Sequence, residues 1–203
     1  MACRDAAGRI QSEKVLQEHL LFLQQLIDSI PNPIFYKDNN GIYRGCNAAF
    51  EAYIGLTKEE VVGKSIYDIA PKDLADKYFD MDSALFSQPG VQVYEASVQY
   101  ADGTRHDVIF NKAAYFNNDG AVAGLVGVII DITSRKLAEK ALRESEEQLR
   151  VIFEGAAIGM VLTDNEGRVV KSNPAFQKLL GYSDKELHNK VLTEFTHPDD
   201  ASV

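Results

Sequence analysis

Residues 33–50 read PIFYKDNNGIYRGCNAAF, and this short stretch contains the local signals that decide the fold. The run 33–36 favours a strand, and Asp38-Asn-Asn-Gly41 is typical of a turn because glycine adopts positive φ without a steric penalty. A second strand-like run covers residues 42–46. Asn47 then precedes a helical pattern, where its side chain is a favoured N-cap. The stretch therefore predicts a β-hairpin followed by a short helix.

The same pattern recurs 126 positions later without a gap. The identical pairs are Asp38/Asp164, Gly41/Gly167, Asn47/Asn173, Ala49/Ala175, Phe50/Phe176, Gly55/Gly181, Glu60/Glu186 and Lys64/Lys190. Helix-capping devices recur as well, because Thr57 with Glu60 and Ser183 with Glu186 both have the spacing of a capping box. Self-similarity of this kind indicates two related domains.

After Lys64 the first copy continues with a helical segment at 74–86 and three strand-like runs. These runs cover residues 91–100, 106–116 and 121–132, with turn sequences at Asp102-Gly103 and Asn118-Asp-Gly120. Helices gathered between the second and third of five strands are typical of an α+β fold. We therefore predict a five-stranded antiparallel sheet with helices on one face, plus flanking amphipathic helices.

Two segments beside this domain carry apolar residues at heptad spacing. They are Leu16, Leu20, Leu23, Ile27 and Ile30 in the first, and Ala138, Leu142, Ser145, Leu149 and Ile152 in the second. Such seams favour a homodimer through Leu16, Leu20, Leu23 and Ile27 and through the linker residues Leu142, Leu149 and Ile152. Packing of each helix on its own sheet is the alternative. The last strand is apolar on both faces, so we expect the N-terminal helix of this chain or of a partner to cover its outer face.

Bulk composition narrows the possible partners. The net charge is −9, and no dense basic patch offsets it, so we expect no nucleic-acid binding. No apolar run reaches the roughly 18–20 residues that span a bilayer, so no membrane partner is expected. The two cysteines form no CxxC pair. Together these features favour a cytoplasmic location.

The ordered motifs resemble the PAS family of bacterial signalling proteins. They are Phe35-Tyr-Lys-Asp38, Cys46-Asn-Ala-Ala-Phe50, Gly55-Leu-Thr-Lys-Glu-Glu-Val-Val-Gly63, Asp102-Gly103, Asp131-Ile-Thr133 and, in the second copy, His197-Pro-Asp-Asp200. The resemblance implies an N-terminal amphipathic helix at 1–27, a complete PAS domain at 28–133, a helical signalling linker at 134–152 and the N-terminal half of a second PAS domain at 153–203.

Enzymatic activity is not expected from these residues. No GxSxG, P-loop, HExxH or GxGxxG pattern occurs, and the histidines lack metal-ligand spacing, so we predict neither a catalytic nor a metal site. The resemblance implies that a full-length parent could be a histidine kinase or a cyclic-dinucleotide enzyme.

The resemblance also bears on cofactors. Haem is disfavoured because the helix at 74–86 has no histidine, and Met81 is interpreted as a core residue. Adduct-forming flavin is excluded because Ile66 occupies the position of the reactive cysteine, as Leu192 does in the second copy. A redox-active flavin stays an open alternative. Cys46 is interpreted as a small buried hydrophobe.

A small-molecule pocket between sheet and helices is what the resemblance implies, with a solid core as the alternative. The candidate pocket residues are Phe35, Phe50, Tyr53, Tyr67, Tyr78, Met81, Val108, Phe110, Asn111 and Ile129, and Lys112 shares the alternation of Val108 and Phe110. We therefore expect a sensory module that binds a small ligand and relays its state through the linker. The alternative is a ligand-free module for dimerisation and relay.

Overall fold

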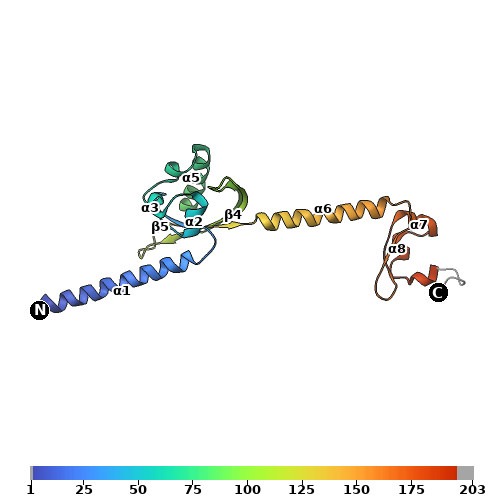
Figure 1. The fold of residues 1–203 in the computed structure, drawn as a ribbon, viewed down its shortest axis with the longest axis horizontal. Coiled ribbons are helices and arrows are strands. Elements are labelled where there is room, and N and C mark those ends of the chain that lie inside the picture. Colours follow the sequence, from blue (N-terminus) through green and yellow to red (C-terminus); the bar gives the residue numbers. More distant parts are fainter. Residues whose placement is uncertain (1, 196–203) are drawn as a thin grey trace. The chain divides into compact units, whose positions relative to one another are not determined.

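A five-stranded antiparallel sheet in the order β2-β1-β5-β4-β3 organises the first of two compact units in the chain (Figure 1). The strands are β1 (Ile34–Asp38), β2 (Tyr43–Cys46), β3 (Val91–Gln99), β4 (Arg105–Phe116) and β5 (Val122–Asp131). The computed structural model describes residues 2–195, with side chains from residue 11 onward, so the motif at 197–200 lies outside the described residues. The predicted α+β fold with a five-stranded antiparallel sheet is confirmed.

The strand register defines an inner face of the sheet. Phe35 of β1 lies beside Gly127 of β5, and Gly127 lies beside Lys112 of β4. Because side chains alternate along a strand, Lys37 shares the face of Phe35. A Cβ atom at Gly127 would collide with the ring of Phe35, so only glycine leaves room for that ring.

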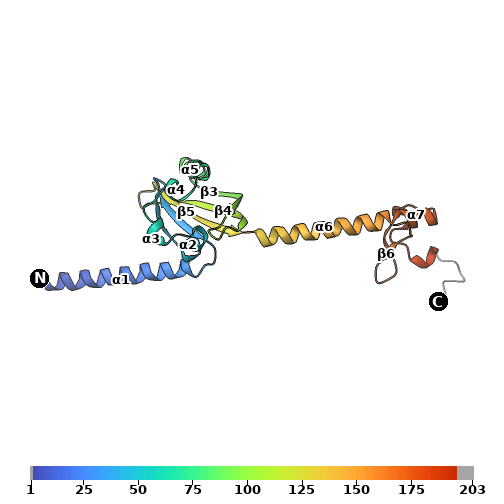
Figure 2. The same ribbon diagram turned by 45° about the horizontal axis from the view of Figure 1, so that its top comes forward.

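Short helices and one longer helix connect β2 to β3 and pack against the sheet (Figure 2). They are α2 (Ala48–Ile54), α3 (Lys58–Val61), α4 (Ile66–Ile69) and α5 (Lys72–Ser87). Helix α2 begins at the N-cap Asn47, whose side chain accepts from the amide of Phe50, and ends at Gly55 with φ of 74°. A capping box of Thr57 and Glu60 starts α3. The capping devices expected from the sequence therefore set the bounds of α2 and the start of α3.

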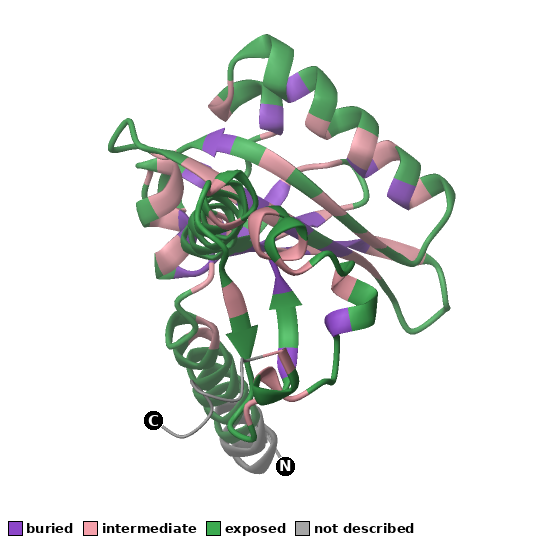
Figure 3. Cartoon of the chain, turned by 90° about the vertical axis from the view of Figure 1, so that its right-hand side faces the viewer, coloured by how far each residue is buried: buried purple, intermediate pink, exposed green. Residues whose placement is uncertain are grey.

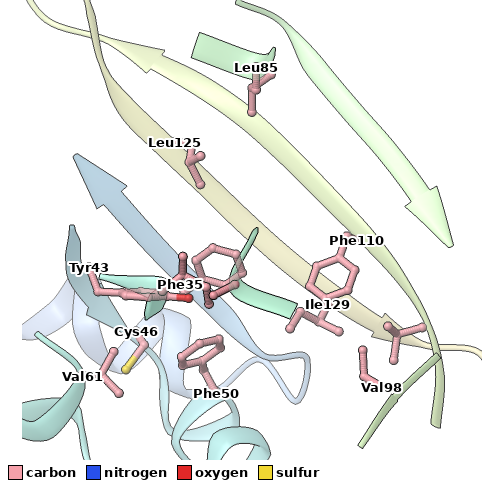
Figure 4. Packing of buried hydrophobic residues seen from close by; sticks show 13 residues of the cluster. Phe35, Tyr43, Cys46, Phe50, Val61, Leu85, Val98, Phe110, Leu125 and Ile129 are labelled. Carbon is pink, nitrogen blue, oxygen red and sulfur yellow. The ribbon is translucent and has the colours of Figure 1, made fainter. Parts of the chain in front are cut away.

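The core of the first unit lies between the inner face of the sheet and these helices. Figure 4 shows Tyr43, Phe35 and Phe50 gathered at one end, and Phe110 with Ile129 at the other. The ring centroids of Phe35 and Phe50 are 5.1 Å apart, within the range of favourable aromatic pairs. Cys46 is buried in the same cluster, where burial raises the pKa of its thiol to about 11. Its interpretation as a small buried hydrophobe fits this environment.

Helix α1 (Ala2–Asp28) belongs to the first unit and contacts the rest of it through its C-terminal end. Gln24 donates to the carbonyl of Cys46, and the backbone amide of Ala48 donates to Asp28. These contacts lie at the start of α2. On the outer face of the sheet, the β3 residues Val91 and Val93 are 70% and 61% exposed. The chain's own N-terminal helix therefore does not cover these β3 residues.

Helix α6 (Thr133–Gly155) follows β5 directly and contains no buried residue. Asp131 caps its first turn by accepting from the backbone amide of Thr133, and Lys136 forms an ion pair with Glu95 of β3 at 2.7 Å. Figure 3 shows that buried segments gather on the strands and short helices, whereas α1 and α6 are exposed along most of their described length. The apolar residues of both heptad seams are therefore accessible.

The second unit repeats the start of the first. It contains β6 (Val161–Thr163), β7 (Val169–Ser172), α7 (Pro174–Leu180), α8 (Asp184–Leu187) and a 3₁₀ turn at Leu192–Phe195. Strands β6 and β7 pair as an antiparallel hairpin, and α7 runs from the N-cap Asn173 to Gly181 with φ of 77°. A capping box of Ser183 and Glu186 starts α8. The repeat inferred from the sequence is thus also a repeat of the backbone path.

Within residues 2–195, none of the helices has both the length and the apolar character needed to cross a bilayer.

Candidate ligand pocket

A cavity of about 770 Å³ opens between the inner face of the sheet and helices α2, α4 and α5. This volume falls within the roughly 300–1,000 Å³ typical of small-molecule sites. Aromatic and aliphatic side chains both line it, and the aromatic rings are Phe35, Tyr43, Phe50, Tyr53, Tyr78, Tyr100 and Phe110. The cavity therefore offers flat apolar surfaces to a ligand.

Three charged side chains lie together at this cavity. Lys37 of β1 donates to Oδ2 of Asp82 at 2.6 Å, and Lys112 of β4 donates to Oδ1 of the same carboxylate at 2.5 Å. The side chains of both lysines are only 2% exposed, and that of Asp82 on α5 is 4% exposed. The lysines line the cavity, whereas Asp82 does not. We call this set the Lys37–Asp82–Lys112 cluster.

Aromatic rings surround the two ammonium groups. The Nζ atom of Lys37 lies 4.5 Å from the ring centroid of Tyr43, and that of Lys112 lies 5.5 Å from the ring of Tyr94. Cation–π attraction of this kind offsets part of the loss of hydration. Burial still lowers the pKa of Lys112, although Asp82 acts in the opposite direction. Burial also raises the pKa of Tyr43 well above its usual value, so its hydroxyl stays protonated.

A family model described as PAS fold matches residues 27–137, and a second PAS fold model matches residues 147–203. The first match alone covers more than half of the chain.

The chain belongs to the PAS family. Among curated relatives, the uncharacterized protein y4lL of Sinorhizobium fredii is 27% identical over 179 residues, which are 87% of this chain and 22% of that protein. The aerobic respiration control sensor protein ArcB of Escherichia coli is 29% identical over 124 residues, covering 61% of this chain and 16% of ArcB. This chain thus spans about a fifth or less of these relatives' length.

Solved structures agree with the fold. The PAS domain of BvgS from Bordetella pertussis is 27% identical, covers 64% of this chain and 98% of that domain, and gives a TM-score of 0.52. The phage VqmA–DPO complex gives a TM-score of 0.52 at 19% identity, covering 84% of this chain and 76% of VqmA, and shows the fold alone. PAS domains are sensory modules, and the named relatives ArcB and BvgS are sensor proteins.

The sequence-predicted pocket residues divide into two groups within this PAS domain. Those that line the cavity are Phe35, Phe50, Tyr53, Tyr78, Phe110 and Ile129. The other four do not line it. Val108 is fully buried in the core, and Asn111 is exposed on the outer face of the sheet. Tyr67 is 46% exposed and packs on Phe79, and the backbone carbonyl of Met81 accepts a hydrogen bond from the side chain of Gln92. The cavity therefore draws on β1, α2, α5, β4 and β5.

Sequence reasoning missed Lys37 and Asp82. Alternation from Phe35 already places Lys37 on the inner face, and Asp82 follows Tyr78 by one helical turn. Both signals were available, but a charged residue in these positions ordinarily faces solvent. Lys112 was placed on the correct face by its alternation with Phe110.

A row of side chains also connects the cavity with the start of α6. Tyr53 and Tyr100 line the cavity and meet edge-on, with ring centroids 4.8 Å apart. The ring of Tyr100 stacks on His106 at 4.0 Å, and Nδ1 of His106 lies 2.7 Å from Oδ2 of Asp131. Burial opposes ionisation of Asp131, but hydrogen bonds from Thr133 and His106 outweigh it and lower the pKa of this carboxyl. The residue that caps α6 is therefore joined to the cavity wall through one side chain, that of His106.

Proposed function

We propose that residues 28–133 form a sensory PAS domain that binds a small ligand in its cavity and relays its state through α6. The observation that carries the proposal is the cavity of about 770 Å³ with aromatic walls and two lysines at its surface. A solid core, which the ligand-free alternative requires, would leave no such space. ArcB and BvgS are sensor proteins, and this supports a sensory role for the shared domain.

A row of side-chain contacts supports the proposed relay. Tyr100 is part of the cavity wall, and His106 joins it to Asp131, which caps α6. A ligand that shifts Tyr100 would change the position of His106 and hence the first turn of α6. The ligand can bias this equilibrium only as far as it binds the two states with different affinity.

Native mass spectrometry of the purified chain tests ligand binding. We expect a co-purified compound of small mass that is released on denaturation. The variant Ala70→Phe, which places a ring in the cavity, should lose it, and Ala141→Phe on the exposed α6 should keep it. A wild-type chain without any co-purified mass, and without affinity for any member of a small-molecule library, would argue for the ligand-free alternative.

We also propose that the chain forms a homodimer through the heptad seams of α1 and α6. In α1 the seam residues Leu16, Leu20 and Leu23 are 56–59% exposed, and in α6 Leu142, Leu149 and Ile152 are 62–65% exposed. Exposed leucines at this spacing are stabilised when a second helix covers them. A homodimer through these two seams is also expected under the ligand-free alternative.

Sedimentation equilibrium tests the dimer. We expect Leu16→Glu together with Leu20→Glu to weaken self-association at least tenfold. The matched control carries Gln17→Glu and Gln25→Glu, which add the same charge at exposed positions of α1 beside the seam. Equal self-association of wild type and the leucine variant would refute the helix-mediated dimer.

A further inference from the structure

The Lys37–Asp82–Lys112 cluster holds more positive than negative charge. Each lysine bonds a different oxygen of the one carboxylate, and each ammonium therefore uses one of its three N–H groups on Asp82. With both lysines protonated the cluster has a formal charge of +1. An unbalanced charge that is almost fully buried is costly, because water is not there to solvate it.

The rest of the cavity wall adds no negative charge. Among the described residues that line it, the charged ones are Lys37, Lys112 and Arg105, and no aspartate or glutamate belongs to the lining. Asp82 reaches the lysines from α5 behind the wall. A ligand in the cavity therefore meets cations and aromatic rings, and its surroundings are electropositive.

We propose that this cavity takes a small organic monoanion, a carboxylate with an aromatic or aliphatic body, whose charged end meets the free N–H groups of Lys37 and Lys112. The inference rests on the proposed ligand-binding function. A carboxylate would bring the cluster to a formal charge of zero, and charge-assisted hydrogen bonds to it are among the stronger ones. The apolar body would lie against Phe50, Tyr53, Tyr78 and Phe110, which line the same cavity.

The pKa values of three buried groups, Lys112, Tyr43 and Tyr94, bear on the charge of the cavity. Burial lowers the pKa of Lys112, although Asp82 acts in the opposite direction. Tyr43 and Tyr94 stay protonated because burial raises the pKa of both phenols. Neither tyrosine therefore supplies the missing negative charge.

Isothermal titration calorimetry of the full chain at pH 7 tests the proposal with three probes of one shape. They are 3-phenylpropanoate, the neutral 3-phenylpropanamide and the cationic 3-phenylpropylamine. We expect the carboxylate to bind at least tenfold more tightly than the amide, and the amine to bind most weakly. Lys112→Met, which leaves a neutral Lys37–Asp82 pair, should bring carboxylate and amide within threefold of one another.

Two further variants separate charge from structural damage. Lys140→Met, on α6 with a side chain 70% exposed, is the matched control and should keep the tenfold preference. Asp82→Asn retains both lysines and removes their internal anion. It should keep or increase the preference for carboxylate, whereas general damage to the cavity would lower it in both Asp82→Asn and Lys112→Met.

The outcomes distinguish this inference from the function on which it rests. Equal binding of carboxylate and amide to the wild type, or an unchanged preference in Lys112→Met, overturns the anion inference and leaves a ligand-binding cavity. Absence of binding by all three probes also overturns the anion inference. The proposed ligand-binding function fails separately, when the native chain carries no co-purified compound and binds nothing from a library.

Discussion

The ring of Tyr100 stacks on the imidazole of His106 with centroids 4.0 Å apart, and this contact joins the cavity wall to the residue that caps α6. Tyr100 directly follows the last residue of β3, whereas Asp131 ends β5 just before α6 begins. His106 on β4 bridges them because β3, β4 and β5 are neighbours in the sheet. The sheet thus gives the cavity a short connection to the helix that leaves the domain.

The first prediction concerns this connection. Replacing His106 by alanine removes the partner of Asp131 and should speed amide hydrogen exchange in the first turn of α6, measured by mass spectrometry of peptides covering 131–138. His188→Ala in the second unit is the control and should leave these peptides unchanged. Unaltered exchange in His106→Ala would show that the histidine does not hold the start of α6.

The second prediction concerns Asn47, which is fully buried. Its Oδ1 accepts from the amides of Ile34 and Phe50, and its Nδ2 donates to the carbonyls of Ile27, Ile30 and Asn32. Asn47→Ala leaves several buried backbone groups without partners and should lower the free energy of unfolding of the first unit by about 3–4 kcal/mol. Native-state hydrogen exchange of β4 and β5 measures this free energy.

Asn39→Ala in the exposed turn after β1 is the control for Asn47 and should change the free energy of unfolding by less than about 0.5 kcal/mol. A similarly small loss in Asn47→Ala would mean that water replaces the lost hydrogen bonds. Asn173 makes the corresponding contacts in the second unit, where its Oδ1 accepts from Met160 and Phe176.

The third prediction concerns the buried cluster. Asp82→Asn leaves Lys37 and Lys112 without a counter-charge and should lower the free energy of unfolding by about 3–5 kcal/mol, because two buried cations lose their common partner. The triple variant with Lys37→Met, Asp82→Leu and Lys112→Met removes all three charges at similar volume. It should unfold within about 1 kcal/mol of the wild type or above it.

Native-state hydrogen exchange of β4 and β5 measures the free energy of unfolding of both variants. A triple variant as unstable as Asp82→Asn would show that the ion pairs themselves contribute net stability, contrary to the expectation. Because the triple variant also lacks the cations of the cavity, it should bind 3-phenylpropanoate no better than 3-phenylpropanamide.

The fourth prediction is a pH dependence from Asp131. Hydrogen bonds hold the pKa of this carboxyl below its ordinary value of 3.8 in the folded state. The folded state therefore gains stability from the carboxylate above the ordinary value, and this gain is lost as the pH falls through the lowered pKa. Compared with Asp131→Asn, the wild type should be more stable at pH 6, and the difference should shrink between pH 4 and pH 2.

Urea unfolding of both proteins at several pH values checks this, with Asp119→Asn in the exposed turn before β5 as the control. A difference between wild type and Asp131→Asn that does not vary below pH 4 would mean that the charge of Asp131 does not matter for the cap.

Most of the fold could be predicted because its signals are local. Turn glycines, N-cap asparagines and capping boxes act over a few residues, so Gly41, Asn47 and Gly55 and their counterparts at 167, 173 and 181 give the bounds of the elements from the sequence alone. Alternation along β1, β4 and β5 predicted three residues of the cavity wall, Phe35, Phe110 and Ile129, but it did not predict Tyr43 or Tyr100. Tyr67 and Asn111 did not line it, because a short helix and a strand face are oriented by tertiary packing.

By itself the sequence determined the duplication and the order of strands and helices apart from the short helix α4, since each depends on neighbouring residues and on the period of apolar side chains. Only the tertiary structure brought Lys37, Asp82 and Lys112 together, from β1, α5 and β4, and left a cavity beside them. The physical reason is that a buried ion pair depends on the distance between residues far apart in the chain, and the register of the sheet and the packing of α5 set that distance.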